Sequence, residues 1–211
     1  MTKYVSVPDS LAEPFERSEG EVARLFEQLQ HSPERGTIHI GEDRYLLLRS
    51  ESLYLALFGA LEESFGPTMA GEFLYNAARE LGHSDSDAFA RRHGLGVGVE
   101  RLSSGPVHFA FSGWARVEIL EDSVPVANES FFLHYQHPNT FEAEVTLARK
   151  GKAEHPVCLF SAGYSSGWCS AAFGLELHAT EQSCVACGAP HCEFVMATFE
   201  RLERIRGERI S

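Results

Sequence analysis

All five cysteines of this 211-residue chain lie in one stretch, which begins at Cys158 and ends at Cys192. Within it, Cys158 is followed by Glu181, Cys184 and Cys192, so a distant partner precedes a short-spaced group. Thiolates and carboxylates at such spacings are typical zinc ligands. Four protein ligands would leave no open coordination position, so the predicted zinc is structural and not catalytic. The sequence therefore predicts a metal site that ties a helix to the final hairpin.

Two further cysteines leave alternatives open. Cys187 forms a CxxC pair with Cys184 and could replace Glu181 as the fourth ligand. Cys169 follows Trp168 in a predicted helix, where a cysteine is more often a small buried apolar residue. The rival to a metal is a set of free or redox-active thiols. An odd number of clustered cysteines in a chain without secretory features favours the metal over a disulfide framework.

The element that must position Cys158 is a helix predicted over 156–173, with a proline in its first turn and Gly174 after its end. The strands 175–183 and 191–197 are predicted to form the final hairpin, which carries the other candidate ligands at its mouth. Closing this hairpin against the helix is what the metal would accomplish.

Alternating apolar residues upstream of that helix predict an antiparallel sheet with helices beside it. Together with the hairpin, this part forms a predicted ligand-binding and zinc lobe over 96–198, followed by a solvated linker helix over 199–211. The predicted strands are 107–111, 114–120 and 130–135, and the predicted helix is 141–150.

Residues 1–35 are predicted to be an N-terminal arm, irregular up to residue 17 and helical over 18–29. A short helix with an apolar face outside the main core either serves dimerisation or packs on its own domain, and the sequence leaves both open. The apolar face consists of Val22, Leu25, Phe26 and Leu29.

Residues 36–95 are predicted to form a second lobe, and the glycine-rich segment 94–99 to link it to the next. That segment lacks the GxGxxG spacing of a dinucleotide site. The predicted fold class is α+β: an antiparallel sheet flanked by helices, with a zinc-stapled helix–hairpin lobe and an N-terminal dimerisation arm. The elements predicted within 36–95 are two strands around a turn in 37–49, a helix over 53–65, and a long or broken helix over 68–93.

Composition limits the function classes. The chain has 18 basic and 30 acidic residues and a formal net charge of −12, which argues against binding to nucleic acid or anionic lipid. No apolar run is long enough to span a bilayer, and residues 1–21 lack the pattern of a signal peptide. The expected location is the cytoplasm.

The zinc-ligand stretch resembles a known family. The segment 163–167 and the pattern Glu181-x-x-Cys184 with Gly188-x-x-x-Cys192 look like a 4-vinyl-reductase-type (4VR) domain. Their spacing is similar to that in the sensory domains of sigma-54-dependent activators responding to phenol and xylene. Segments 36–48 and 77–88 resemble the amino-terminal region of the same activators, which includes a dimerising arm. The resemblance implies that zinc is bound through Cys158, Glu181, Cys184 and Cys192.

The resemblance also implies a closed pocket for a small aromatic effector between the sheet and the helices. Phenol-type members hold the hydroxyl with a His and a Trp, but the segment beginning at Thr140 aligns so that His137 takes the place of the Trp. The position of the family's His falls near Glu100, so this chain departs from the phenol pattern. Ordinary core packing is the alternative for every candidate. The candidate lining residues are His108, Phe111, Trp114, Phe132, Tyr135, His137 and Tyr164.

The family's function implies a homodimeric sensor that transmits effector binding to transcription through a partner or an output domain. No GxxxxGK[ST] motif is present, so ATP hydrolysis by that route is not expected of this sequence. The alternatives are a tetrapyrrole carrier, in which His137 or His108 approaches a bacteriochlorophyll precursor, and a scaffold. No nicotinamide, flavin or GxSxG motif indicates an enzyme, so a role in vinyl reduction is the only enzymatic alternative.

Overall fold

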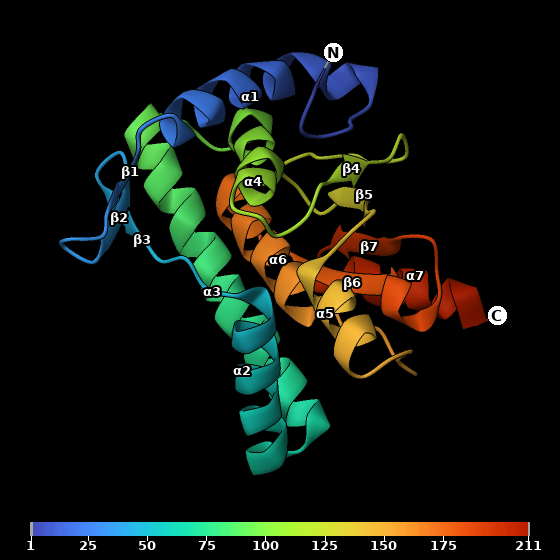
Figure 1. The fold of residues 1–211 in the computed structure, drawn as a ribbon. Helices are drawn as coiled ribbons and strands as arrows, with labels where there is room; N and C mark the ends of the chain where they lie inside the picture. Colours follow the sequence, from blue (N-terminus) through green and yellow to red (C-terminus); the bar gives the residue numbers. More distant parts are fainter. Residues whose placement is uncertain (1, 211) are drawn as a thin grey trace.

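The computed structural model describes residues 2–210, and their side chains as far as residue 205. Helix α6 lies at the centre, with α3 along one side of it and a four-stranded sheet along the other (Figure 1). Helix α1 crosses over α4 at one end of the molecule, and α2 lies against α3 at the other. The helices are α1 Ala12–Phe26, α2 Ser50–Phe65, α3 Pro67–His93, α4 Val99–Phe111, α5 Phe141–Arg149, α6 Leu159–Phe173 and α7 Phe199–Ile210, with 3-10 turns at Asp9–Leu11 and Val185–Cys187.

Two antiparallel sheets accompany the helices. The larger has the strand order β4-β5-β7-β6, and the smaller, far from it, has the order β1-β2-β3. Side chains alternate along a strand, so Leu133, Tyr135 and His137 of β5 point into the core. The strands are β1 Leu29–Ser32, β2 Thr37–Ile40, β3 Asp43–Tyr45, β4 Glu118–Ile119, β5 Phe132–His137, β6 His178–Ser183 and β7 Cys192–Ala197.

Glycines set the distance between α3 and α6. A Cβ atom on Gly167 would overlap the carbonyl oxygen of Arg79, and one on Gly163 would overlap that of Tyr75. From the opposite side, a Cβ on Gly82 would overlap the carbonyl of Tyr164. The two backbones therefore touch, which is possible only because these positions carry no side chain.

The α+β class and most elements downstream of residue 130 are confirmed, including the final hairpin and the helix before it. Helix α6 begins at Leu159, however, with Cys158 as its N-cap and not inside its first turn as predicted. Its end is as predicted, because Gly174 adopts a left-handed conformation with φ of 63°.

The strand predicted over 107–111 is wrong, because these residues are the last part of helix α4. Buried Leu102, Gly105 and Phe109 recur at helical spacing, and Pro106 sits inside the helix without ending it. The strand predicted over 114–120 shrinks to the two residues of β4. A short apolar run does not distinguish a buried helix from a strand, and here the helical period was the correct one.

The N-terminal arm is also more ordered than predicted, because α1 already begins at Ala12. Val22 and Leu25 are buried and α1 packs on α4 of the same chain, so the alternative of packing on its own domain is the one observed. Leu29 belongs to β1 and is 56% exposed. Among the residues that the structure describes, no helix is long and apolar enough to cross a bilayer.

Candidate functional site

Three cysteine sulfurs form a triangle at the mouth of the final hairpin. The Sγ atom of Cys158 lies 3.9 Å from that of Cys184 and 3.5 Å from that of Cys192, and the last two are 3.8 Å apart. A Zn–S distance of about 2.3 Å places the sulfurs of a tetrahedral site about 3.8 Å apart. Disulfide sulfurs would be about 2 Å apart, so these spacings are those of ligands around one ion.

Glu181 completes the cluster as its fourth member. One ligand atom from each of the four residues lies within 4.8 Å of the others. Glu181 is on β6 beside a bulge, and its Oε2 accepts a hydrogen bond of 2.9 Å from the backbone N–H of Cys158. Cys187, the alternative fourth ligand, is outside this group and half-buried.

The cluster has the unmet chemistry that a cation would satisfy. The Oε1 atom of Glu181 is buried, and no polar partner for it occurs in the described chain. Burial, together with the neighbouring Cys184 thiolate, raises the pKa of Glu181 to about 8. Two groups also reach the sulfurs from outside: Val185 N–H donates to Cys192 Sγ at 3.3 Å, and Thr140 Oγ1 lies 3.1 Å from Cys158 Sγ. The residues present can thus hold a metal ion.

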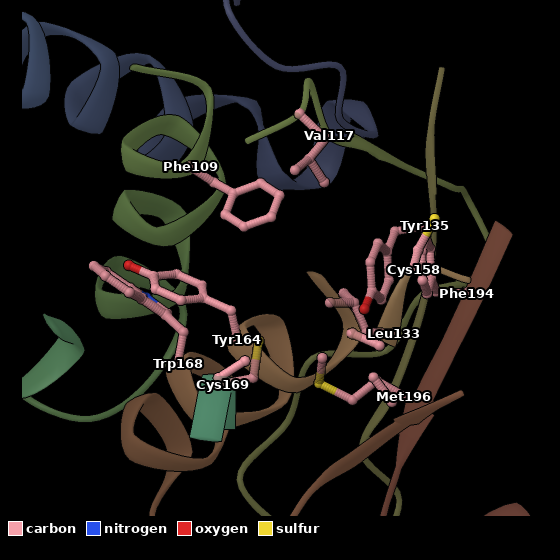
Figure 2. Packing of buried hydrophobic residues seen from close by; sticks show 14 of the residues in the cluster. Phe109, Val117, Leu133, Tyr135, Cys158, Tyr164, Trp168, Cys169, Phe194 and Met196 are labelled. Atoms are coloured by element: carbon pink, nitrogen blue, oxygen red, sulfur yellow. The ribbon is translucent and has the colours of Figure 1, made fainter. Parts of the chain in front are cut away.

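A small cavity lies between α4, α6 and the inner face of the sheet. Its volume is about 30 Å³, which is room for about one water molecule. Figure 2 shows Phe109, Tyr164 and Trp168 on one side of this region and Leu133 and Tyr135 on the other. The lining residues are Leu102, Gly105, Pro106, Phe109, Val117, Leu133, Tyr135, Tyr164, Ser165, Trp168 and Cys169.

Polar groups around the cavity differ in whether the protein satisfies them. The Tyr164 hydroxyl donates to Asp85 at 2.7 Å, and Trp168 Nε1–H donates to the Arg101 carbonyl at 3.1 Å. By contrast, the described chain offers no hydrogen-bond partner to the Tyr135 hydroxyl or to either ring nitrogen of His137. Both side chains are fully buried, and burial lowers the pKa of His137 to about 3, so its ring is neutral.

The structure places two of the seven predicted lining residues, Tyr135 and Tyr164, on the cavity itself. Two more, Trp114 and His137, stand one layer behind, with ring centroids 5.1 Å and 5.5 Å from that of Phe109. His108 is also in this second layer, because its ring stacks on Trp168 at 5.6 Å.

The other two predicted residues lie away from the cavity. Phe111 packs against Tyr4 and Phe26 under the N-terminal helix. Phe132 is on the outer face of the sheet beneath Arg201, because its position in β5 is one residue out of phase with Tyr135.

Sequence reasoning missed several residues that do line the cavity. Leu133 follows from the alternation of β5 once Tyr135 is taken to point inward. Leu102, Gly105 and Phe109 follow from the helical period of α4, which was obscured by the predicted strand. Trp168 was noticed only as a neighbour of Cys169, although both line the cavity.

Comparison with known families divides the chain into two matched parts. Residues 24–124 match the model described as an activator of aromatic catabolism, and residues 138–198 match the 4VR domain. Two similar curated proteins are the phenol regulator MopR of Acinetobacter guillouiae and the transcriptional regulatory protein XylR of Pseudomonas putida. Each is 25% identical over 83% of this chain, which spans only 31% of the relative's length.

The fold is also similar to a solved structure, the phenol-responsive sensory domain of the transcription activator PoxR with phenol. The TM-score is 0.76 at 25% identity, with 96% of this chain and 97% of the other covered. The resemblance inferred from the sequence is thereby confirmed. The chain joins an activator-of-aromatic-catabolism region to a 4VR domain, as in the sensory regions of aromatic-responsive activators.

Proposed function

We propose that this chain is a cytoplasmic sensor module that binds a small aromatic effector in the cavity between α4, α6 and β5. The observation that carries the proposal is the cavity's aromatic wall, in a fold similar to a phenol-responsive sensory domain. No part of the proposal requires catalysis. The residues proposed to contact the effector or support its site are His108, Trp114, Tyr135, His137 and Tyr164, together with Phe109 and Trp168.

The size of the cavity favours a small effector over a tetrapyrrole. Benzene occupies engineered cavities on the order of 150 Å³, so even one ring requires the walls around the 30 Å³ cavity to move apart. A tetrapyrrole, with its four linked rings, would require the core to be rebuilt. Differential affinity for the widened and the narrow arrangement is what would make binding a signal.

The cluster of Cys158, Glu181, Cys184 and Cys192 is proposed to hold a structural zinc ion. Three soft thiolates and one carboxylate at tetrahedral spacing suit zinc better than magnesium or calcium, which prefer oxygen ligands. All four positions would be taken by protein, so the ion would fix α6 to the β6–β7 hairpin without activating a substrate.

Signalling is proposed to pass through a homodimer to an output domain or a partner protein. The apolar face of α1 is covered by its own chain, so the dimer contact is assigned to apolar residues that remain exposed at Leu46–Leu48 and along α2. The division into arm (1–35), N-terminal lobe (36–95), ligand and zinc lobe (96–198) and linker helix (199–211) is part of this proposal.

Isothermal titration calorimetry with phenol tests effector binding, with a cavity-filling variant as the comparison. Cys169→Met adds two atoms at a residue that lines the cavity, so we expect phenol affinity to fall at least about tenfold. Val97→Met places the same side chain at a position that is 71% exposed and away from the cavity, so it should bind as the unmodified protein does. If the unmodified protein binds none of phenol, toluene and xylene, the proposed function is wrong.

A further inference from the structure

Three aromatic side chains with a polar group line the cavity: Tyr135, Tyr164 and Trp168. Two of these groups are already engaged. The Tyr164 hydroxyl donates to Asp85 and lies 3.4 Å from His108 Nδ1, and the Trp168 N–H donates to a main-chain carbonyl of α4. Recruiting either of them for a ligand would break a hydrogen bond that the protein now makes.

The Tyr135 hydroxyl is different because it is buried and unpaired. Tyr135 is 1% exposed, and among the described residues nothing lies in hydrogen-bonding geometry with its oxygen. The Ser165 hydroxyl, also on the cavity wall, is near enough to influence the pKa of Tyr135 but does not meet that geometry. His137 is unpaired as well, but it is not on the cavity wall. Buried polar groups in folded proteins are nearly always satisfied, so an unpaired hydroxyl on a cavity wall indicates a ligand group that pairs with it.

The charge of the wall restricts the ligand further. No lysine, arginine or protonated histidine is among the lining residues. Arg101, on the far side of α4, is already held by Ser86 and Asp87. A carboxylate brought into such a site would be an uncompensated buried charge, whereas a neutral hydroxyl could both donate to Tyr135 and accept from it.

The geometry points to the Tyr135 hydroxyl as the group that reads the effector's polar substituent, and to a neutral hydroxylated aromatic as the effector. This inference rests on the proposed function and narrows it to one atom and one ligand class. Tyr135 is a specificity determinant in this view, while the apolar wall supplies affinity common to all small aromatic rings.

Calorimetric titration of the full chain and its Tyr135→Phe variant with phenol and with toluene tests the inference. We expect the unmodified protein to bind phenol about tenfold more tightly than toluene, which corresponds to one hydrogen bond. Tyr135→Phe should abolish this preference by weakening phenol while leaving toluene equal or tighter. Benzoate should not bind either protein.

Tyr164→Phe is the matched control, because it removes a hydroxyl that already has partners. It should lower the melting temperature and keep the preference for phenol, whereas Tyr135→Phe should leave the melting temperature unchanged or higher. A Tyr135→Phe variant that still prefers phenol tenfold would overturn the inference and leave the proposed function standing. If the unmodified protein binds neither phenol nor toluene, both fail together.

Discussion

Helices α6 and α2 are both rich in apolar residues, yet their surroundings are opposite. Thirteen residues of α6 are buried, whereas Tyr54 is the only residue of α2 that is. Helix α6 is enclosed by α3, α4 and the sheet, while α2 and the beginning of α3 project from the body of the molecule (Figure 1). One helix is completed by the elements around it, and the other presents apolar surface that the described residues leave uncovered.

The exposed apolar residues near α2 are numerous. Leu46, Leu47 and Leu48, which lead into the helix, are 76%, 85% and 59% exposed. Single exposed leucines are ordinary, but several near one another indicate an interaction surface. The other exposed large apolar side chains of α2 and of the first part of α3 are Leu57, Phe65, Met69 and Phe73.

The largest effect is expected where α6 is fixed at its N-terminus. Cys184→Ala removes one of four clustered ligands, so we expect the zinc content to fall from about one ion per chain to none. Stability should fall by roughly 5 kcal/mol or more, because metal binding is coupled to folding.

Metal analysis and urea unfolding measure these two changes. Cys187→Ala is the control, because Cys187 is in the same hairpin connection but outside the cluster, and this variant should keep its metal. Equal metal content in the two variants would refute the assignment of the cluster.

A glycine substitution in each helix compares the two regions directly. Gly167→Ala would force the backbones of α3 and α6 apart, and we expect a loss of about 3 kcal/mol in the free energy of unfolding. Gly59→Ala in α2 meets nothing within 4 Å and should stabilise the protein by up to about 1 kcal/mol, because alanine favours helix. Denaturant titration measures both. A tolerated Gly167→Ala would show that the two backbones are not in contact in solution.

The smallest change in stability is expected on the exposed side. Leu47→Ser should alter the free energy of unfolding by less than about 0.5 kcal/mol, because Leu47 is 85% exposed. It should nevertheless shift the protein from dimer to monomer in light scattering. Val97→Ser, at a position that is 71% exposed, should leave the mass unchanged. A monomeric unmodified protein, or an unaffected dimer in Leu47→Ser, would reject the assigned surface.

The zinc cluster could be predicted from sequence because ligand type and spacing are encoded locally. Cys158, Cys184 and Cys192 flank a helix start and a hairpin, and such elements bring their ends together whatever the rest of the chain does. The cavity could not be predicted in the same way. Its wall combines α4, α6 and β5, and one wrong element shifts several residues at once.

The errors have identifiable physical causes. The apolar run 107–111 satisfies both a strand and a helix, and only the burial of Leu102 and Gly105 upstream reveals the helical period. Phe132 differs from Tyr135 only in strand phase, which the sequence does not fix by itself. The exposed leucines at 46–48 look like an ordinary strand end until the structure shows that nothing in the described chain covers them.

The glycine contacts between α3 and α6 also determine how the molecule can change shape. Two helices whose backbones already touch have no room to approach further and move as one rigid plate. Swelling of the cavity towards a ring-sized volume must therefore displace the opposite boundary, formed by α4 and β5. Helix α4 contains Pro106, which removes one of its internal hydrogen bonds, and it supports α1. Deformation caused by a ligand is consequently directed towards the N-terminal end of the chain.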